Sequence, residues 1–227
     1  MKPLRAFLAV AAAGRAVLAV RFWSLVARVR LGAHNARVGR RLSVRGPIHL
    51  HCHRTGTIRI GDDCRIQSGF AGNPVGNGSR MAIWVGPGGC LTLGDRVGLS
   101  NSTIVCMSSV SIGDDTFLGG GSQVYDTDFH SVNASERGRP GNPGTRTAPV
   151  VIGRSTFVGG HSILLKGVEI GEEAVIGAGS VVRSDVAPRE VWAGNPAVFV
   201  RELAPAAPGP RPRTSAGPRR LGAGASG

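Results

Sequence analysis

The chain has 227 residues and a hydrophobic fraction of 41%, the ordinary composition of a globular protein with one main domain. Its 35 glycines and an aromatic fraction of only 5% favour tight repeated turns over a bundle of bulky helices. The formal net charge of +13 is confined to the ends, because residues 46–203 carry a net charge of −1. This neutral body argues against a nucleic-acid surface built into the fold, and no nucleic-acid partner is expected.

The first segment, residues 1–45, is predicted to be a basic helical arm. It holds ten basic residues and no acid, is rich in Ala, Leu and Val, and has no proline after Pro3. Its longest uncharged run, residues 6–14, is too short to cross a bilayer, which takes about 20 apolar residues in a row. Three interpretations stay open: a helix that lies on an anionic membrane surface, a helix that caps the open end of the body, and a signal peptide, against which Arg15 and Arg21 argue.

Three histidines alternate with apolar residues just after the arm. An extended segment would place His49, His51 and His53 on one face. Such spacing can bind zinc or nickel, but a solvent-facing strand surface is the preferred interpretation and no metal is expected. The four cysteines show neither CxxC pairing nor metal-finger spacing, and are predicted to be small apolar side chains in a reducing compartment.

From Thr57 onward the sequence repeats with a period of six. After a proline- and glycine-rich break at residues 138–149, an aliphatic residue recurs at every sixth position: Ile152, Val158, Leu164, Ile170, Ile176 and Val182. Neither a helical period of 3.6 nor simple alternation explains this spacing, whereas short strands separated by tight corners do. Each hexapeptide is therefore predicted to form one wall of a triangular coil, with its aliphatic side chain pointing inward.

This repeat resembles the hexapeptide-repeat acyltransferases, the family that includes galactoside, maltose and serine acetyltransferases. The resemblance covers about residues 57–203, and residues 192–197 are similar to the family's AGNPA signature. It implies an all-β fold, a left-handed parallel β-helix, whose hand could not be derived because the usual crossover preference predicts the opposite. The β-helix domain is placed at residues 46–203 with an excursion loop at 134–149, followed by a disordered tail at 204–227.

The segment from Tyr125 to Asn133 interrupts the repeat just before the excursion loop. Acetyl transfer to an alcohol needs a base for the hydroxyl proton, and neutral imidazole suits that task near pH 7. The segment resembles the sugar O-acetyltransferases, in which a histidine here is the catalytic base, so His130 is predicted to be that base. Asp126 or Asp128 would hold its ring, and the choice between them stays open. By the same resemblance Asn101, together with Asp128, is predicted to bind the acceptor.

Residues 157–168 resemble the family segment that lines the pantetheine slot between neighbouring subunits. The resemblance implies that the backbone amide of Gly160 faces the thioester oxygen, where a preorganised donor stabilises developing charge. Ala178 would contact pantetheine through its backbone, and Arg183 would meet a phosphate of CoA. Acetyl-CoA is thus the implied co-substrate, and a homotrimer that is inactive as a monomer is the implied assembly.

These expectations describe an acetyl-CoA-dependent O-acetyltransferase acting on a saccharide-type acceptor. The expected acceptor is an envelope or exopolysaccharide sugar, free or lipid-linked, and the expected location is the cytoplasm or the inner face of the cell membrane. The choice between an acetyl and a longer acyl donor stays open. Two alternatives remain: a non-catalytic β-helix scaffold, and a metal-dependent hydratase of the γ-carbonic-anhydrase kind, whose paired histidines are not evident.

Overall fold

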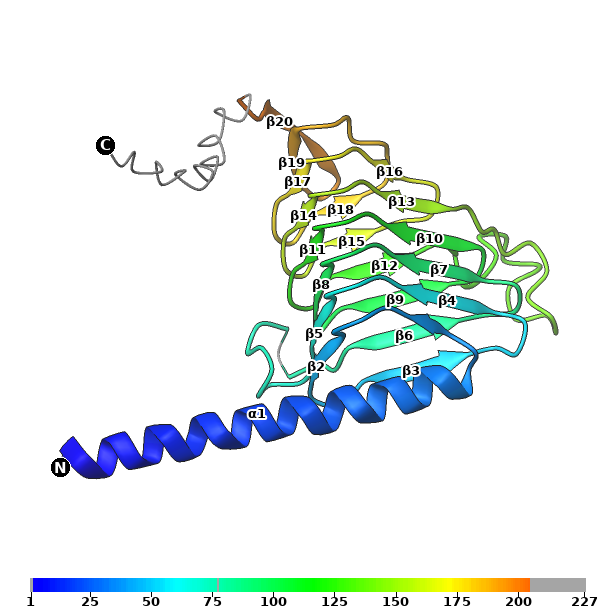
Figure 1. Ribbon diagram of the computed structural model, residues 1–227. Coiled ribbons are helices and arrows are strands. Elements are labelled where there is room, and N and C mark those ends of the chain that lie inside the picture. Colours follow the sequence, from blue (N-terminus) through cyan, green and yellow to red (C-terminus); the bar gives the residue numbers. More distant parts are fainter. Residues whose placement is uncertain (1, 77, 205–227) are drawn as a thin grey trace, which may run out of the picture.

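The computed structural model describes residues 2–76 and 78–204, with the side chains of the first helix from Gly14 onward. Helix α1 (Lys2–Ala33) comes first, and a column of short strands stacked as three sheets follows it (Figure 1). The predicted disordered tail lies, from residue 205 onward, outside the described residues.

From β1 to β18 the strands are distributed in rotation over three sheets, which we name A, B and C, and the last two strands, β19 and β20, both belong to sheet B. Sheet A contains β1 (Arg37–Val38), β4 (Thr57–Ile60), β7 (Cys90–Leu93), β10 (Ser109–Ile112), β13 (Val150–Ile152) and β16 (Glu169–Ile170). Sheet B contains β2 (Ser43–Arg45), β5 (Arg65–Gln67), β8 (Gly98–Ser100), β11 (Phe117–Leu118), β14 (Phe157–Val158), β17 (Val175–Ile176), β19 (Glu190–Gly194) and β20 (Ala197–Glu202). Sheet C contains β3 (His49–Cys52), β6 (Ala82–Val85), β9 (Thr103–Cys106), β12 (Gln123–Tyr125), β15 (Ile163–Leu164) and β18 (Val181–Val182). Three successive strands make one coil, so the chain forms a parallel β-helix.

The core runs along the axis of this β-helix, as the six-residue period predicts. Ile152 pairs in register with Ile112 of the coil before and Ile170 of the coil after, and Leu164 pairs with its neighbours in the same way. All six predicted sixth-position residues from Ile152 to Val182 are 0–1% exposed. The prediction that each hexapeptide is one wall with an inward aliphatic residue is therefore confirmed.

The β-helix begins earlier than the sequence boundary at residue 46. Strands β1 and β2 lie within the segment expected to be a helical arm, and they pair with β4 and β5. Leu42 and Val44 of this segment are buried in the core, while its arginines stay on the outside, where Arg40 pairs with Asp62 at 2.6 Å. Because this segment is rich in arginine, its composition did not indicate the two short strands, although their inward positions are apolar.

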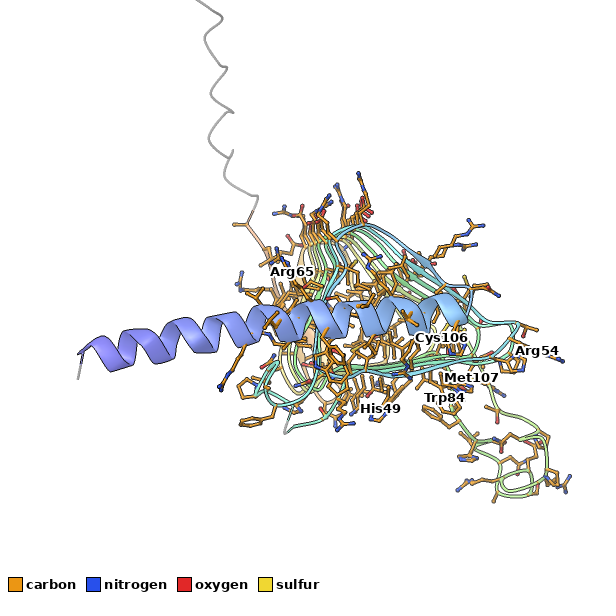
Figure 2. All side chains as sticks on the ribbon, turned by 60° about the horizontal axis from the view of Figure 1, so that its bottom comes forward. His49, Arg54, Arg65, Trp84, Cys106 and Met107 are labelled. Carbon is orange, nitrogen blue, oxygen red and sulfur yellow. The ribbon has the colours of Figure 1, made fainter. Side chains whose placement is uncertain are left out.

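Helix α1 closes the open end of the β-helix. Figure 2, which brings this end forward, shows the helix crossing the triangular coil. Ala27 and Leu31 are at most 2% exposed against the first coil, and the Arg30 guanidinium donates to the carbonyl oxygens of Ile48 at 2.7 Å and Leu50 at 3.2 Å. The N-terminal half continues past the edge of the coil (Figure 1). Within the described residues, no helix is long and apolar enough to span a membrane.

Two loops leave the regular coils. The loop between β5 and β6, which the structure describes at residues 69–76 and 78–81 and which we call the 69–81 loop, is an insertion that the six-residue period does not predict, although glycines and an Asn-Pro pair mark it. Residues 126–149 connect β12 to β13 and form an excursion loop that leaves at the corner between sheets C and A, so the loop begins eight residues before the predicted start at residue 134. Its two ends pair, because the Ala148 N–H donates to the Asp126 carbonyl oxygen at 2.9 Å and the Asp128 N–H to that of Arg146 at 3.0 Å. The loop therefore has a defined neck.

Candidate functional site

A groove of about 660 Å³ lies between the outer face of sheet C and the excursion loop. We call it the sheet C groove, and its lining residues are Ala82, Trp84, Thr103, Val105, Met107, Thr127, Phe129, Gly141, Asn142, Thr145 and Thr147. Trp84 is 51% exposed and stacks on His51 with 3.9 Å between ring centroids. Figure 2 shows Trp84 and Met107 on the side of the coil from which the loop projects. The groove thus has an apolar wall on the coil and a more polar wall on the loop.

His130 lies at the foot of the excursion loop with its ring exposed. Its Nδ1 is 3.2 Å from Oδ1 of Asn142, and the Asn142 amide nitrogen donates to the Phe129 carbonyl oxygen at 3.1 Å. Because the amide nitrogen is committed to that carbonyl, the amide oxygen faces the ring and Nδ1 carries the imidazole proton. Nε2 then keeps its lone pair, which is the form of histidine that can accept a proton.

The backbone beside His130 adopts a conformation that is rare for a large side chain. Phe129 has φ 63°, in the left-handed region, which costs about 1–2 kcal/mol for a residue other than glycine. Two hydrogen bonds hold the turn: the Phe129 N–H donates to Thr127 Oγ1 at 3.2 Å, and the His130 N–H donates to the Asp128 carbonyl oxygen at 2.7 Å. Local strain of this kind is often kept at functional sites, and here it turns Phe129 into the groove wall beside the imidazole.

The two aspartates considered as supports for His130 have other partners. The Asp126 carboxylate is fully buried and accepts the backbone N–H groups of Met107 at 2.7 Å and Ser108 at 2.6 Å. Burial raises the pKa of Asp126, although these backbone donors act against the rise. The Asp128 carboxylate lies 2.7 Å from Lys166 Nζ in the next coil. Among the described residues the partner of the imidazole is therefore Asn142, and an acceptor-binding role of Asp128 stays a prediction.

Asn101 occupies the corner between β8 and β9 and is only 1% exposed. Its Oδ1 accepts the Gly69 N–H at 2.7 Å, and its amide nitrogen donates to the carbonyl oxygens of Asn73 and Val75, both at 2.8 Å. These three bonds anchor the 69–81 loop to the coil. Acceptor binding by Asn101 stays a prediction, and it would use a side chain that already holds this loop.

The residues predicted to contact the cofactor lie at two different corners. Gly160 and Ala178 follow β14 and β17 at the corner between sheets B and C, where the Gly179 N–H donates to the Gly160 carbonyl oxygen at 2.9 Å. Arg183 follows β18 and is exposed at the corner between sheets C and A, on the same edge as His130. The structure thus groups Gly160 with Ala178, and sheet C separates this pair from His130 within one chain.

The histidine stripe has the predicted alternation along β3. His49 and His51 are exposed while the residues between and after them are buried, and His53 Nδ1 lies 2.8 Å from Thr55 Oγ1. Over residues 2–76 and 78–204, no group of three or more His, Cys, Asp or Glu side chains is placed to hold a metal ion. His51 instead supports Trp84 at the edge of the sheet C groove.

Three groove residues were not predicted from the sequence. Asn142 lies in the sequence Gly-Asn-Pro-Gly, which predicts a turn but does not predict that Asn142 contacts His130. Trp84 takes an outward position of a strand, and an exposed tryptophan there is a recognisable signal of binding. Thr145 Oγ1 is buried in the groove wall and has no hydrogen-bond partner among the described residues. Only the three-dimensional path of the loop brings Asn142 and Thr145 to this wall.

Comparisons with known proteins agree on the repeat. Residues 149–184 match the family described as bacterial transferase hexapeptide (six repeats). The galactoside O-acetyltransferase of Escherichia coli (strain K12) is 34% identical over 109 residues, which cover 45% of this chain and 49% of that protein. A protein of Staphylococcus aureus (strain COL) with a provisional acetyltransferase name is 45% identical over 78 residues, which cover 34% of this chain and 37% of that protein. The chain therefore spans less than half the length of these curated relatives.

A solved structure shares the architecture over most of the chain. It is a mutant of AntD, an N-acyltransferase from Bacillus cereus, in complex with dTDP-4-amino-4,6-dideoxyglucose and coenzyme A. The TM-score is 0.53 at 15% identity, covering 75% of this chain and 84% of that one, a likeness that concerns the fold alone. The stacked coils define a left-handed parallel β-helix protein, as predicted. Within this fold, residues 149–184 carry the repeat of the bacterial transferase hexapeptide family.

Proposed function

We propose that this protein is an acyltransferase that moves an acetyl group from acetyl-CoA to a hydroxyl of a saccharide-type acceptor. The observation that carries the proposal is the exposed imidazole of His130, which Asn142 orients so that Nε2 keeps its lone pair. Asn142 and Phe129, its two neighbours, line the sheet C groove. The names of the relatives support the reaction class, because they include a galactoside O-acetyltransferase.

The proposed reaction is a direct transfer with His130 as general base. Nε2 takes the proton of the acceptor hydroxyl as its oxygen attacks the thioester carbonyl, so a carbon–oxygen bond forms. The carbon–sulfur bond then breaks, and His130 returns the proton to the departing CoA sulfur. No covalent intermediate on the protein is needed, and no oxidant or reductant takes part.

The proposed cofactor positions are Gly160, Ala178 and Arg183. The Gly160 N–H has no acceptor among the described residues, so it is available to donate to the oxygen that becomes negative during attack. Ala178 is exposed beside it, open to a pantetheine chain, and the exposed guanidinium of Arg183 suits a phosphate of CoA. Acetyl-CoA bound to these residues would supply the activated acyl group.

A homotrimer would unite the two corners. Within one chain sheet C lies between His130 and the Gly160–Ala178 pair, so a complete site needs His130 from one subunit and this pair from its neighbour. Closed threefold symmetry repeats such a contact three times without leaving an unpaired surface. We therefore include the homotrimer in the proposal.

The sheet C groove is the proposed acceptor site. Its volume of about 660 Å³ is in the range of small-molecule pockets. The half-exposed Trp84 ring presents a flat apolar surface to the face of a sugar ring. An envelope or exopolysaccharide sugar, free or lipid-linked, is the proposed acceptor. Since acetyl-CoA is a cytoplasmic metabolite, the reaction would occur in the cytoplasm or at the inner face of the membrane.

Thiol release from acetyl-CoA, measured against a panel of sugars and nucleotide sugars, tests this function. We expect release that depends on an acceptor and falls at least about 100-fold in His130→Ala, the usual loss for a general base. His53→Ala is the matched control, because that ring contacts Thr55 and should leave the rate unchanged. Equal rates in His130→Ala and the wild type would remove His130 from the mechanism. A protein that binds neither acetyl-CoA nor any sugar in calorimetry would contradict the enzyme assignment and favour the scaffold.

A further inference from the structure

Helix α1 has two apolar faces, and the β-helix covers only one of them. Ser24, Ala27 and Leu31 recur at helical spacing on the face that packs against the first coil. On the opposite face four large apolar side chains recur at the same kind of spacing: Leu18, Phe22, Leu25 and Val29. They are 66%, 57%, 63% and 63% exposed. We name these four residues the α1 stripe.

The α1 stripe is long, continuous and placed at one end of the molecule. Its first and last residues are eleven positions apart, which is about 16 Å along a helix. Helix α1 crosses the open end of the β-helix and continues past its edge (Figures 1 and 2). Because the stripe residues are exposed and lie opposite the helix face that packs on the first coil, the stripe faces away from the coil. An exposed apolar surface of this kind marks a contact with a partner or a membrane.

The charges around the α1 stripe identify the chemistry of its partner. Arg15 and Arg21 are exposed and, by helical geometry, border the stripe on its two sides. No acidic residue occurs anywhere in residues 1–45. A second copy of this helix would bring like charges together, whereas anionic lipid headgroups would accept the arginines while the acyl region takes up the apolar side chains.

We propose that α1 binds the surface of a membrane containing anionic lipid, with the α1 stripe inserted between headgroups and Arg15 and Arg21 on their phosphates. The helix lies in the plane of the membrane surface, since its opposite face stays packed on the first coil. In a homotrimer whose symmetry axis follows the β-helix, three such helices share one end and one plane. This inference is independent of the acetyl-transfer reaction.

Flotation of the full chain with lipid vesicles tests the proposal, using phosphatidylcholine alone and phosphatidylcholine mixed with phosphatidylglycerol. The wild type is expected to float with the mixed vesicles and to be released as salt is added. Replacing both Leu18 and Phe22 by Glu should lower the partition coefficient at least about tenfold for each buried side chain lost. Replacing both Arg15 and Arg21 by Gln should lower it about fivefold for each charge on mixed vesicles, with little change on phosphatidylcholine.

Val200→Glu is the matched control. This residue is also a large apolar side chain, 54% exposed, but it lies on β20 at the other end of the β-helix. Its substitution should leave flotation unchanged, and circular dichroism of every variant should show the wild-type fold. The proposal is overturned if the wild type does not float with the mixed vesicles. It is equally overturned if the Leu18/Phe22 variant floats like the wild type. Vesicle binding that is kept while the variant dissociates into smaller oligomers would overturn it too.

Discussion

At the scale of single residues, the contact between His130 and Asn142 matters most for the proposed reaction. A base can act only if the ring nitrogen that faces the hydroxyl has no proton, and the 3.2 Å contact to Asn142 Oδ1 places the proton on the opposite nitrogen. Partners of this kind orient the ring and fix its tautomer, and their loss leaves the base present but poorly aimed. Asn142 is therefore a positioning residue in the proposed reaction.

Removing the Asn142 side chain should lower kcat while leaving the binding of acetyl-CoA nearly unchanged. Asn142 has φ 50°, so Asn142→Gly deletes the amide without adding backbone strain, and we expect kcat to fall at least about tenfold. Asn142→Asp keeps an oxygen for Nδ1–H, so much of the activity should return. The new carboxylate would raise the pKa of the imidazole, which moves the acidic limb of the kcat profile to higher pH.

The pH profile separates positioning from a merely structural role. If Asn142 only braced the excursion loop, Asn142→Gly and Asn142→Asp would lose activity together, and the acidic limb would stay at the wild-type pH. Thermal melting of both variants supplies the control for folding. That pattern, in two folded proteins, would contradict the positioning role.

The proposed base could be named from the sequence, and the residue that contacts its ring could not. His130 follows a break in a six-residue repeat and resembles the base of a known family, so its position in the chain is enough to propose it as the base. The sequence offers Asp126 and Asp128 as nearby candidate partners, but the Asp126 carboxylate accepts backbone N–H groups and the Asp128 carboxylate pairs with Lys166. Asn142 reaches the ring from twelve residues away because the loop folds back on its own neck. Nothing in the local pattern encodes that return.

At the scale of elements, the corner between sheets A and B is bordered by a ladder of ion pairs between successive coils. Arg40 pairs with Asp62, Arg96 with Asp115 at 2.6 Å and Arg154 with Glu172 at 2.6 Å. Hydrogen bonds from the arginine side chains hold the pKa of Asp115 and of Glu172 below their ordinary values. Each pair connects one coil to the next, although a single exposed ion pair of this kind contributes little to the free energy of unfolding.

Because the pKa of each ladder carboxyl is lowered by folding, the ladder should stabilise the protein above about pH 4 and lose its effect as the pH falls through the lowered values. We expect the melting temperature to drop between pH 5 and pH 2.5, and the drop to shrink in high salt. Arg96→Gln, which removes the partner of Asp115, should make the drop smaller. Arg201→Gln, an exposed arginine bonded to a carbonyl oxygen, is the control. Identical pH dependence in Arg96→Gln and the wild type would rule out the ladder as a source of acid sensitivity.

The elements with strict periodicity were predictable, and those without it were not. The coils from Ile152 to Val182 follow from the spacing of their aliphatic residues, since each inward side chain must stack on the next. Strands β1 and β2 have only two and three residues, too few to show a period beside their arginines. The 69–81 loop has turn residues, but the bonds that anchor it come from Asn101 of the following coil.

At the scale of the whole molecule, the proposed site is divided between subunits. His130 lies at the corner between sheets C and A, and Ala178 at the corner between sheets B and C. If both corners meet only across a subunit contact, two variants that are inactive for different reasons can repair each other. Ala178→Trp suits this test, because Ala178 is exposed and a bulky ring there would block the pantetheine path without disturbing the core.

Subunits of His130→Ala and Ala178→Trp, each expected to be nearly inactive alone, should regain activity when unfolded together and refolded as a mixture. Random assembly makes three quarters of the trimers mixed, and each mixed trimer has one intact site out of three, so about a quarter of the wild-type rate should return. Light scattering should give three times the chain mass of 23.4 kDa for each sample. A control checks that the subunits mix: the double variant, which carries both changes in one chain, is refolded with wild-type subunits. A trimer of two wild-type subunits and one double-variant subunit keeps one intact site in three. Trimers that mix without regaining activity would mean that one chain supplies both corners of its own site, and the division of the site between subunits would be wrong.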